Sequence, residues 1–172
     1  MLLIGPEDTR ARDRAEPLLE RLRAAGAASV ALEVYPIYLA DAGPAGREAL
    51  PAVLDAEPAQ LVDGPPDVLD VTPRPGMVSP WSSKAQDILQ RIGVHDVRRL
   101  ERGRRYRLSG VAPELLDPVA TTGALHDRMT EALWHGAADA GRLFAVPAAA
   151  TVASVPLQAQ GRAALGLSLI HI

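Results

Sequence analysis

The segment at residues 72–80 constrains the fold of this chain more than any other part of the sequence. It reads Thr-Pro-Arg-Pro-Gly-Met-Val-Ser-Pro and so holds three prolines in nine residues. Proline has no backbone N–H, and it disfavours helical geometry in the residue before it, so this segment cannot be a helix. An apolar run at residues 68–72 leads into it. The sequence therefore predicts a strand followed by an irregular junction.

A helix is predicted to follow the junction. Apolar side chains recur at helical spacing from residue 81 to residue 92. Ser79 and Pro80 suit the N-cap and the first helical position, because a serine oxygen accepts a free N–H of the first turn and a proline has none to satisfy. Ser82 and Ser83 are alternative caps.

The remaining elements are predicted from the same kinds of pattern. Alternating or apolar runs predict strands, and helical periodicity predicts helices. The predicted strands are residues 1–5, 29–40 and 97–108, and the predicted helices are residues 10–25, 47–57 and 122–144. The run Asp-Gly-Pro-Pro at residues 63–66 predicts a turn. Pro36 indicates an edge strand or a bulge, and Gly103 indicates a bend if residues 97–108 form a hairpin rather than one strand.

The order of these elements predicts the fold class. Strands and helices alternate over 172 residues, which is enough for one ordinary domain, and their connections are short. This order favours an α+β fold, a ferredoxin-like sandwich of an antiparallel sheet and helices, over a doubly wound parallel sheet.

Composition excludes several classes of function. The 18 basic residues face 21 acidic ones, so the net charge of −3 provides no general field for nucleic acid. The absence of cysteine removes disulfides, thiolate zinc sites, iron–sulfur clusters and a cysteine nucleophile. Neither a bilayer-spanning run nor an export signal is visible, so we expect a soluble, cytoplasmic protein without a membrane partner.

The junction contains the candidate functional side chains. They are two cations, three hydroxyls and one indole at the start of a helix: Arg74, Ser79, Trp81, Ser82, Ser83 and Lys84. Such a helix start suits a phosphate or a carboxylate. Proline-rich turns and serine caps are also ordinary structural devices, so a structural or domain-docking loop is the alternative. No P-loop or dinucleotide-binding motif is present.

Other patterns point to no catalytic or metal site. Residues 98–107 hold six arginines, which could follow a nucleic acid backbone, but in an acidic chain they better fit a solvated strand face or an interface with an acidic neighbour. The four histidines lack metal-ligand spacing, so we expect no metal site. The acidic residues do not form a catalytic pair, and the junction serines lack a nucleophile-elbow context.

The junction resembles the N-terminal signature of a known family. Residues 71–88 contain V-T-P-R-P-G, then S-P-W-S-S-K-A, then D-I, as in phosphoribosylformylglycinamidine synthase, the large single-chain formylglycinamide ribonucleotide amidotransferase. Met77 stands where the family usually has threonine. The similarity continues at residues 97–103, 125–131 and 157–165 and is weakest over the first 60 residues.

The resemblance implies a fold and a role. The family's N-terminal domain is similar to a dimer of the small PurS-type subunit found where the enzyme is split into separate chains. The whole enzyme converts formylglycinamide ribonucleotide, ATP and glutamine to the amidine, with Mg²⁺. Its ATP site lies in a synthetase domain, and its nucleophilic cysteine lies in a glutaminase domain. The resemblance therefore implies a docking domain whose partners are those two domains, with no catalytic residue and no cofactor of its own.

The chain is expected to have three parts. Residues 1–145 form the PurS-like domain, and residues 146–166 form a linker and the start of the next domain, cut short. Residues 167–172 read Leu-Ser-Leu-Ile-His-Ile and resemble a translated sequencing adapter, so we expect a non-native tail. The rival hypothesis is a complete small α+β module that binds an anionic metabolite or assembles other proteins.

Overall fold

The fold is built on one six-stranded sheet, in mixed α+β architecture. The computed structural model describes residues 1–27, 29–59, 67–112, 115 and 125–145. The strands lie in the order β3-β1-β2-β5-β4-β6, and all pairs between them are antiparallel. Their bounds are Leu2–Ile4 (β1), Ala31–Ala42 (β2), Glu57–Ala59 (β3), Val68–Pro73 (β4), Val97–Ser109 (β5) and Glu131–His135 (β6).

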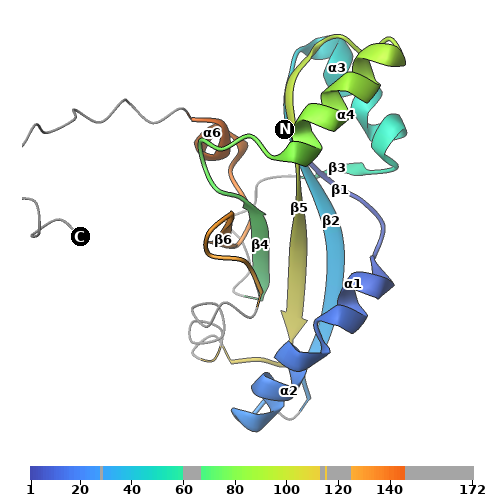
Figure 1. Ribbon diagram of the computed structural model, residues 1–172. Coiled ribbons are helices and arrows are strands. Elements are labelled where there is room, and N and C mark those ends of the chain that lie inside the picture. The colour runs from blue at the N-terminus through green and yellow to red at the C-terminus, as the bar shows by residue number, and fades with distance from the viewer. Residues whose placement is uncertain (28, 60–66, 113–114, 116–124, 146–172) are drawn as a thin grey trace, which may run out of the picture.

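Helices pack on both faces of the sheet (Figure 1). They are Thr9–Arg14 (α1), Glu16–Ala24 (α2), Pro44–Leu54 (α3), Pro80–Arg91 (α4) and Ala140–Phe144 (α6). The sheet with its helices is consistent with the predicted ferredoxin-like sandwich, and the predicted α+β class is confirmed.

One sheet face is covered in two separate halves. Helix α2 packs with Leu32 and Val34 of β2 at one end, and helices α3 and α4 pack with Ala40 and Ala42 at the other. These four residues of β2 share a face because side chains alternate along a strand. The opposite face carries Ile37 and Leu39, which pack with α6. None of the helices in the described residues lies over the middle of the first face.

The predicted helix at residues 10–25 is two helices. Helix α1 ends at Arg14 and α2 begins at Glu16, with Ala15 as the cap between them. Pro17 accounts for the break, because it cannot donate a helical hydrogen bond and disfavours helical geometry in the residue before it. The predicted 47–57 helix starts earlier, with Pro44 in its first turn, and ends at Leu54, while residues 57–59 form β3.

Pro36 lies in a central strand, so the prediction of an edge strand was wrong. Strand β2 pairs with β1 on one side and β5 on the other, and its register shifts at Asp41 and Ala42 rather than at Pro36. The carbonyl of Pro36 accepts the N–H of Gly5 at 2.9 Å, just past the end of β1. Because N–H and C=O of one residue point to the same side in an antiparallel sheet, the missing N–H of Pro36 faces Gly5, where the pairing with β1 has already ended.

Gly103 does not bend β5, which runs as one strand rather than a hairpin. It pairs with Ile37 in the middle of the sheet. A Cβ atom at Gly103 would lie 2.4 Å from the carbonyl oxygen of Val71 and 3.1 Å from Cγ1 of Ile37. The glycine is therefore required by close packing on neighbouring strands, not by a turn.

The predicted helix at residues 122–144 was also wrong over residues 125–139. The Asp127 carboxylate accepts the N–H of Met129 at 2.8 Å and forms a local turn that competes with a helix. Strand β6 follows and pairs with β4, and the indole N–H of Trp134 donates to the Thr72 hydroxyl at 2.8 Å. Only the short α6 is helical. Tertiary pairing here overrides an apparent helical periodicity.

Several predictions lie outside the described residues. These are the turn at residues 63–66, the domain division beyond residue 145, the similarity at residues 157–165 and the tail at residues 167–172. Within the described residues, none of the helices has the length and apolarity needed to cross a bilayer.

Candidate functional site

Ser79 begins helix α4, as the sequence predicted. Its backbone is extended, and its hydroxyl oxygen accepts the N–H of Ser82 at 3.1 Å. Pro80 occupies the first helical position, where its missing N–H costs nothing. The strand, irregular junction and helix at residues 68–91 are thus confirmed.

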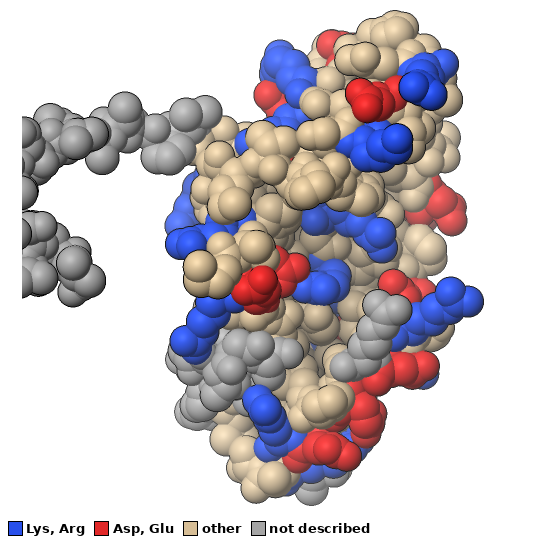
Figure 2. Space-filling view, in the orientation of Figure 1, with Lys and Arg blue, Asp and Glu red and all other residues tan. Residues whose placement is uncertain are grey.

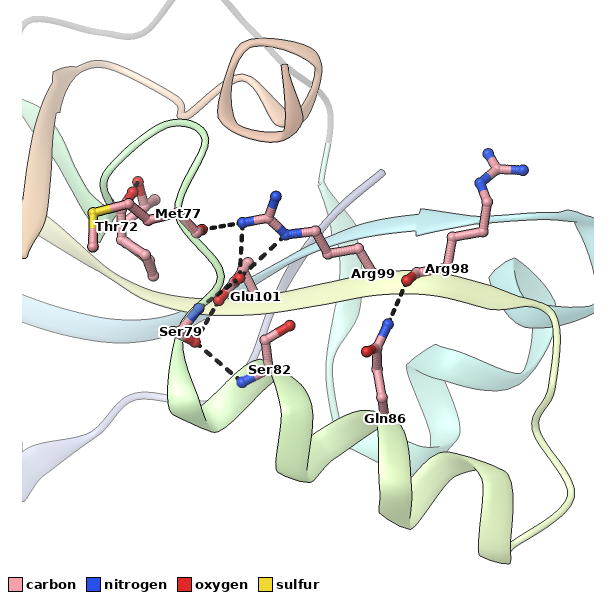
Figure 3. A network of polar contacts seen from close by, with 9 residues as sticks. Thr72, Met77, Ser79, Ser82, Gln86, Arg98, Arg99 and Glu101 are labelled. Atoms are coloured by element: carbon pink, nitrogen blue, oxygen red, sulfur yellow. Dashed lines mark hydrogen bonds and ion pairs between the residues drawn. The ribbon is translucent and has the colours of Figure 1, made fainter. Parts of the chain in front are cut away.

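A buried carboxylate on β5 holds this helix start in place. Glu101 is fully buried and accepts the Ser79 hydroxyl at 2.5 Å and the Ser79 N–H at 3.2 Å. Arg99 donates to the same carboxylate from Nε at 3.2 Å and from Nη2 at 3.0 Å (Figure 3). The charge of Glu101 is therefore both paired and hydrogen-bonded, which a buried carboxylate requires.

The rest of the junction is anchored on its other side. Arg99 also donates to the carbonyl of Met77, and its guanidinium lies 4.9 Å from the ring centre of Phe144 on α6. The N–H of Gly76 donates to the carbonyl of Leu143 at 3.1 Å, and the N–H of Arg74 donates to the carbonyl of Thr130 at 3.1 Å. Hydrogen bonds from β5, from α6 and from the turn before β6 thus fix residues 74–79 in one conformation.

The six candidate residues do not form one cluster. Ser79 is partly buried and serves as the cap. Ser82 is fully buried, and its hydroxyl has no partner among the described residues. Trp81 is half-buried against Tyr38, with ring centres 6.0 Å apart. The side chains of Arg74, Ser83 and Lys84 are exposed. Two of the three serines therefore have structural positions, and only the exposed residues remain available to a partner.

Glu101 was not among the residues predicted to support the junction. It lies in the arginine-rich run, where it is the one acidic residue of residues 98–107. An acidic residue flanked by arginines in a strand signals local pairing, and that signal was available.

Most of the arginines in residues 98–107 are paired with carboxylates. Five ion pairs join this run to neighbouring elements or to Glu101: Arg98 with Asp41, Arg99 with Glu101, Arg104 with Glu131, Arg105 with Asp70 and Arg107 with Glu33. The hydrogen bonds from Arg98 hold the pKa of the Asp41 carboxyl below its usual value. The run is therefore a set of paired strand positions, not a continuous basic surface.

A cavity of about 780 Å³ lies on the sheet face between α1 and the start of α4. Strands β2 and β5 form its floor with Pro36, Arg102 and Gly103, and the junction forms one wall with Val78 and Trp81. Figure 2 shows basic side chains in the middle of this face, between the upper and lower helices. Arg102 was not among the predicted site residues.

The described residues hold no group of three or more histidine or acidic side chains that could bind a metal ion.

The chain matches the model of a known protein family. The model of the family described as formylglycinamide ribonucleotide amidotransferase N-terminal matches residues 34–144, which is more than half of the chain.

Proposed function

Because the chain belongs to the formylglycinamide ribonucleotide amidotransferase N-terminal family, and so forms part of a purine-biosynthesis enzyme, we propose that it is a docking domain. In this proposal its partners are the synthetase and glutaminase domains of the same enzyme. Formylglycinamide ribonucleotide, ATP and glutamine react in those domains, with Mg²⁺ as a cofactor, in the cytoplasm. This domain contributes no catalytic residue.

The anchored junction is the observation that carries this proposal. Met77 and Val78 are 47% and 59% exposed although they are apolar, and they lie in a segment held by Glu101, Arg99 and α6. A rigid segment loses little conformational entropy on binding, so it is a favourable place for an interface. Exposed apolar side chains beside charged ones are typical of protein contact sites.

Two cations flank this apolar surface. Arg74 precedes Met77, and Lys84 lies on α4 after the junction, and both are exposed with no ion pair to another described residue. Unpaired cations at the rim of an apolar patch fit carboxylates on a partner domain.

Docking at this surface would serve the passage of ammonia. Ammonia released from glutamine must reach the synthetase site without mixing with water, where it would be protonated. The domains must therefore keep fixed positions relative to one another. The role of Arg74 and Lys84 is therefore to stabilise the assembly, not to take part in the chemistry.

The test uses the whole enzyme with Arg74→Ala and Lys84→Ala combined. We expect the rate supported by glutamine to fall several-fold relative to the rate supported by added ammonia, because loosened domains lose ammonia to solvent. Glutamate released per amidine formed should rise above one.

Arg91→Ala is the matched control, because Arg91 is an exposed cation in the last turn of the same helix. It should leave both rates unchanged. Equal loss of the glutamine-supported and ammonia-supported rates in the double variant, or no loss in either, would contradict the docking role.

A further inference from the structure

Two arginines interrupt the row of apolar side chains on one face of β5. Along the face that packs under α2 and α4, the strand presents Leu100 and Leu108, both fully buried, at its ends. Between them, the alternation of side chains places Arg102 and Arg104 on the same face. Arg102 is exposed and Arg104 is half-buried, because none of the described helices covers this part of the face. Both arginines line the cavity.

Most polar side chains of the cavity already have partners. Arg104 pairs with Glu131 at 2.7 Å, and Asp8 accepts the N–H of Ala11 as the cap of α1. The Ser79 hydroxyl donates to Glu101, and the Thr130 hydroxyl donates to Asp127. These groups stabilise the walls and are not free to bind a ligand.

Among the charged and hydroxyl-bearing side chains of the cavity, two remain without a partner among the residues that the structure describes. Arg102 forms no ion pair or side-chain hydrogen bond with any described residue, in contrast to the five other arginines of residues 98–107. Tyr106 is only 6% exposed, and within the described part of the chain its hydroxyl has no hydrogen-bond partner. Both side chains line the same cavity.

The other walls are apolar. Ala11 of α1 and Ala15, the cap between α1 and α2, lie on one side, and Met77, Val78 and Trp81 lie on the other. The volume of about 780 Å³ falls within the range of roughly 300–1,000 Å³ that is usual for small-molecule sites. A cavity with apolar walls and a few unpaired polar groups is the usual form of such a site.

We propose that this cavity binds a small organic anion whose carboxylate or phosphate pairs with Arg102 and whose flat apolar body lies between Trp81 and α1. The guanidinium is the group that recognises both kinds of oxyanion, and its planar fork can donate two hydrogen bonds to one of them. A polar group at the far end of the ligand meets the Tyr106 hydroxyl, since Arg102 and Tyr106 lie four residues apart, about 13 Å along a strand. The site goes beyond the docking role and does not depend on it.

Three probes test the site on the 172-residue chain: phenyl phosphate, benzoate and inorganic phosphate. Binding is measured by calorimetry and by the indole N–H signals in NMR spectra. The two tryptophans give an internal control, because Trp81 lines the cavity whereas Trp134 donates to Thr72 on the other side of the sheet. We expect saturable binding of phenyl phosphate or benzoate with a shift of the Trp81 signal and none of the Trp134 signal.

Variants then test whether Arg102 binds the anion. Arg102→Ala should weaken binding about tenfold or more, since a charge-assisted hydrogen bond is lost, and Arg102→Lys should restore part of it. Arg91→Ala should bind as the unchanged chain does, because Arg91 is an exposed cation outside the cavity. Melting temperatures establish that each variant is folded. Tighter binding of phenyl phosphate identifies a phosphate ligand, and tighter binding of benzoate identifies a carboxylate.

The proposal is overturned if none of the probes binds saturably, or if Arg102→Ala binds as tightly as the unchanged chain. It is also overturned if Arg102→Ala impairs the coupling of glutamine hydrolysis in the whole enzyme while no probe binds. In that case the cavity receives an acidic side chain of a partner domain. Failure of the docking test with Arg74 and Lys84 has no bearing on these outcomes.

Discussion

The hydroxyl of Ser79 donates a 2.5 Å hydrogen bond to Oε2 of Glu101, 22 residues later in the chain. This contact joins the first residue before α4 to the middle of the sheet. Because the same carboxylate also accepts Arg99, it links the junction to α6 through the contact of Arg99 with Phe144. The conformation of the junction therefore depends on a strand and a helix that the sequence places well after it.

Glu101→Gln should destabilise the fold by about 2–4 kcal/mol. The amide keeps the shape of the side chain but leaves the charge of the half-buried Arg99 without its partner. The free energy of unfolding in urea measures the effect. Ser79→Ala should cost less, about 1–2 kcal/mol, because it removes a cap and one hydrogen bond but no charge. A smaller loss for Glu101→Gln than for Ser79→Ala would show that the ion pair with Arg99 contributes little.

Asp70→Ala should destabilise the fold by about 3–5 kcal/mol, since it leaves the charge of buried Arg105 without a partner. The two side chains form a bidentate pair at 2.7 and 2.8 Å, and Asp70 also accepts the N–H of Ala138 at 2.7 Å. The double variant Asp70→Leu with Arg105→Met should regain much of this loss, because it removes both charges together. Urea unfolding of the single and double variants gives the comparison, and a double variant no more stable than Asp70→Ala would contradict the expectation.

Gly103→Ala should destabilise the sheet by about 1–3 kcal/mol, because its Cβ would press against the carbonyl oxygen of Val71, which is backbone and cannot turn away. Gly93→Ala is the control. Nothing lies within 4 Å of a Cβ there, and only its positive φ of 84° adds strain, at about 1 kcal/mol. Thermal unfolding ranks the two variants, and a Gly103→Ala variant no less stable than Gly93→Ala would contradict the close contact with Val71.

Tyr106 should ionise at a higher pH than free tyrosine, because burial raises the pKa of its phenol above 10.0. The unfolded chain loses this proton first as the pH rises. The contribution of Tyr106 to stability is therefore complete below about pH 10 and is lost as the pH rises through the folded-state value. Absorbance titration of the phenolate in the unchanged chain and in Tyr106→Phe gives the pH at which Tyr106 ionises.

The stability of the unchanged chain should fall more steeply above pH 10 than that of Tyr106→Phe. Tyr35→Phe is the control for the second tyrosine whose pKa is raised, by burial and by its hydrogen bond to Glu33. Parallel stability curves for the unchanged chain and Tyr106→Phe would contradict burial of this phenol.

Local sequence determined the elements whose signals need no distant partner. The three prolines of residues 72–80 exclude a helix by their own geometry, and Ser79 caps α4 through a hydrogen bond to a residue three positions on. The same local chemistry predicted most of the strands and the α+β class. The family signature also lies within this stretch, so membership could be predicted from the sequence alone.

Tertiary structure decided what depends on partners far along the chain. Residues 131–135 form a strand because β4 offers an edge to pair with, although their spacing suits a helix. Pro36 is tolerated in a central strand because β1 ends beside it. Arg102 is left without a carboxylate because β2 and β5 place it over a gap between helices, while its neighbours reach acids on β2, β4 and β6. Contacts between residues tens of positions apart are made by strand pairing, and a pattern within one segment does not contain them.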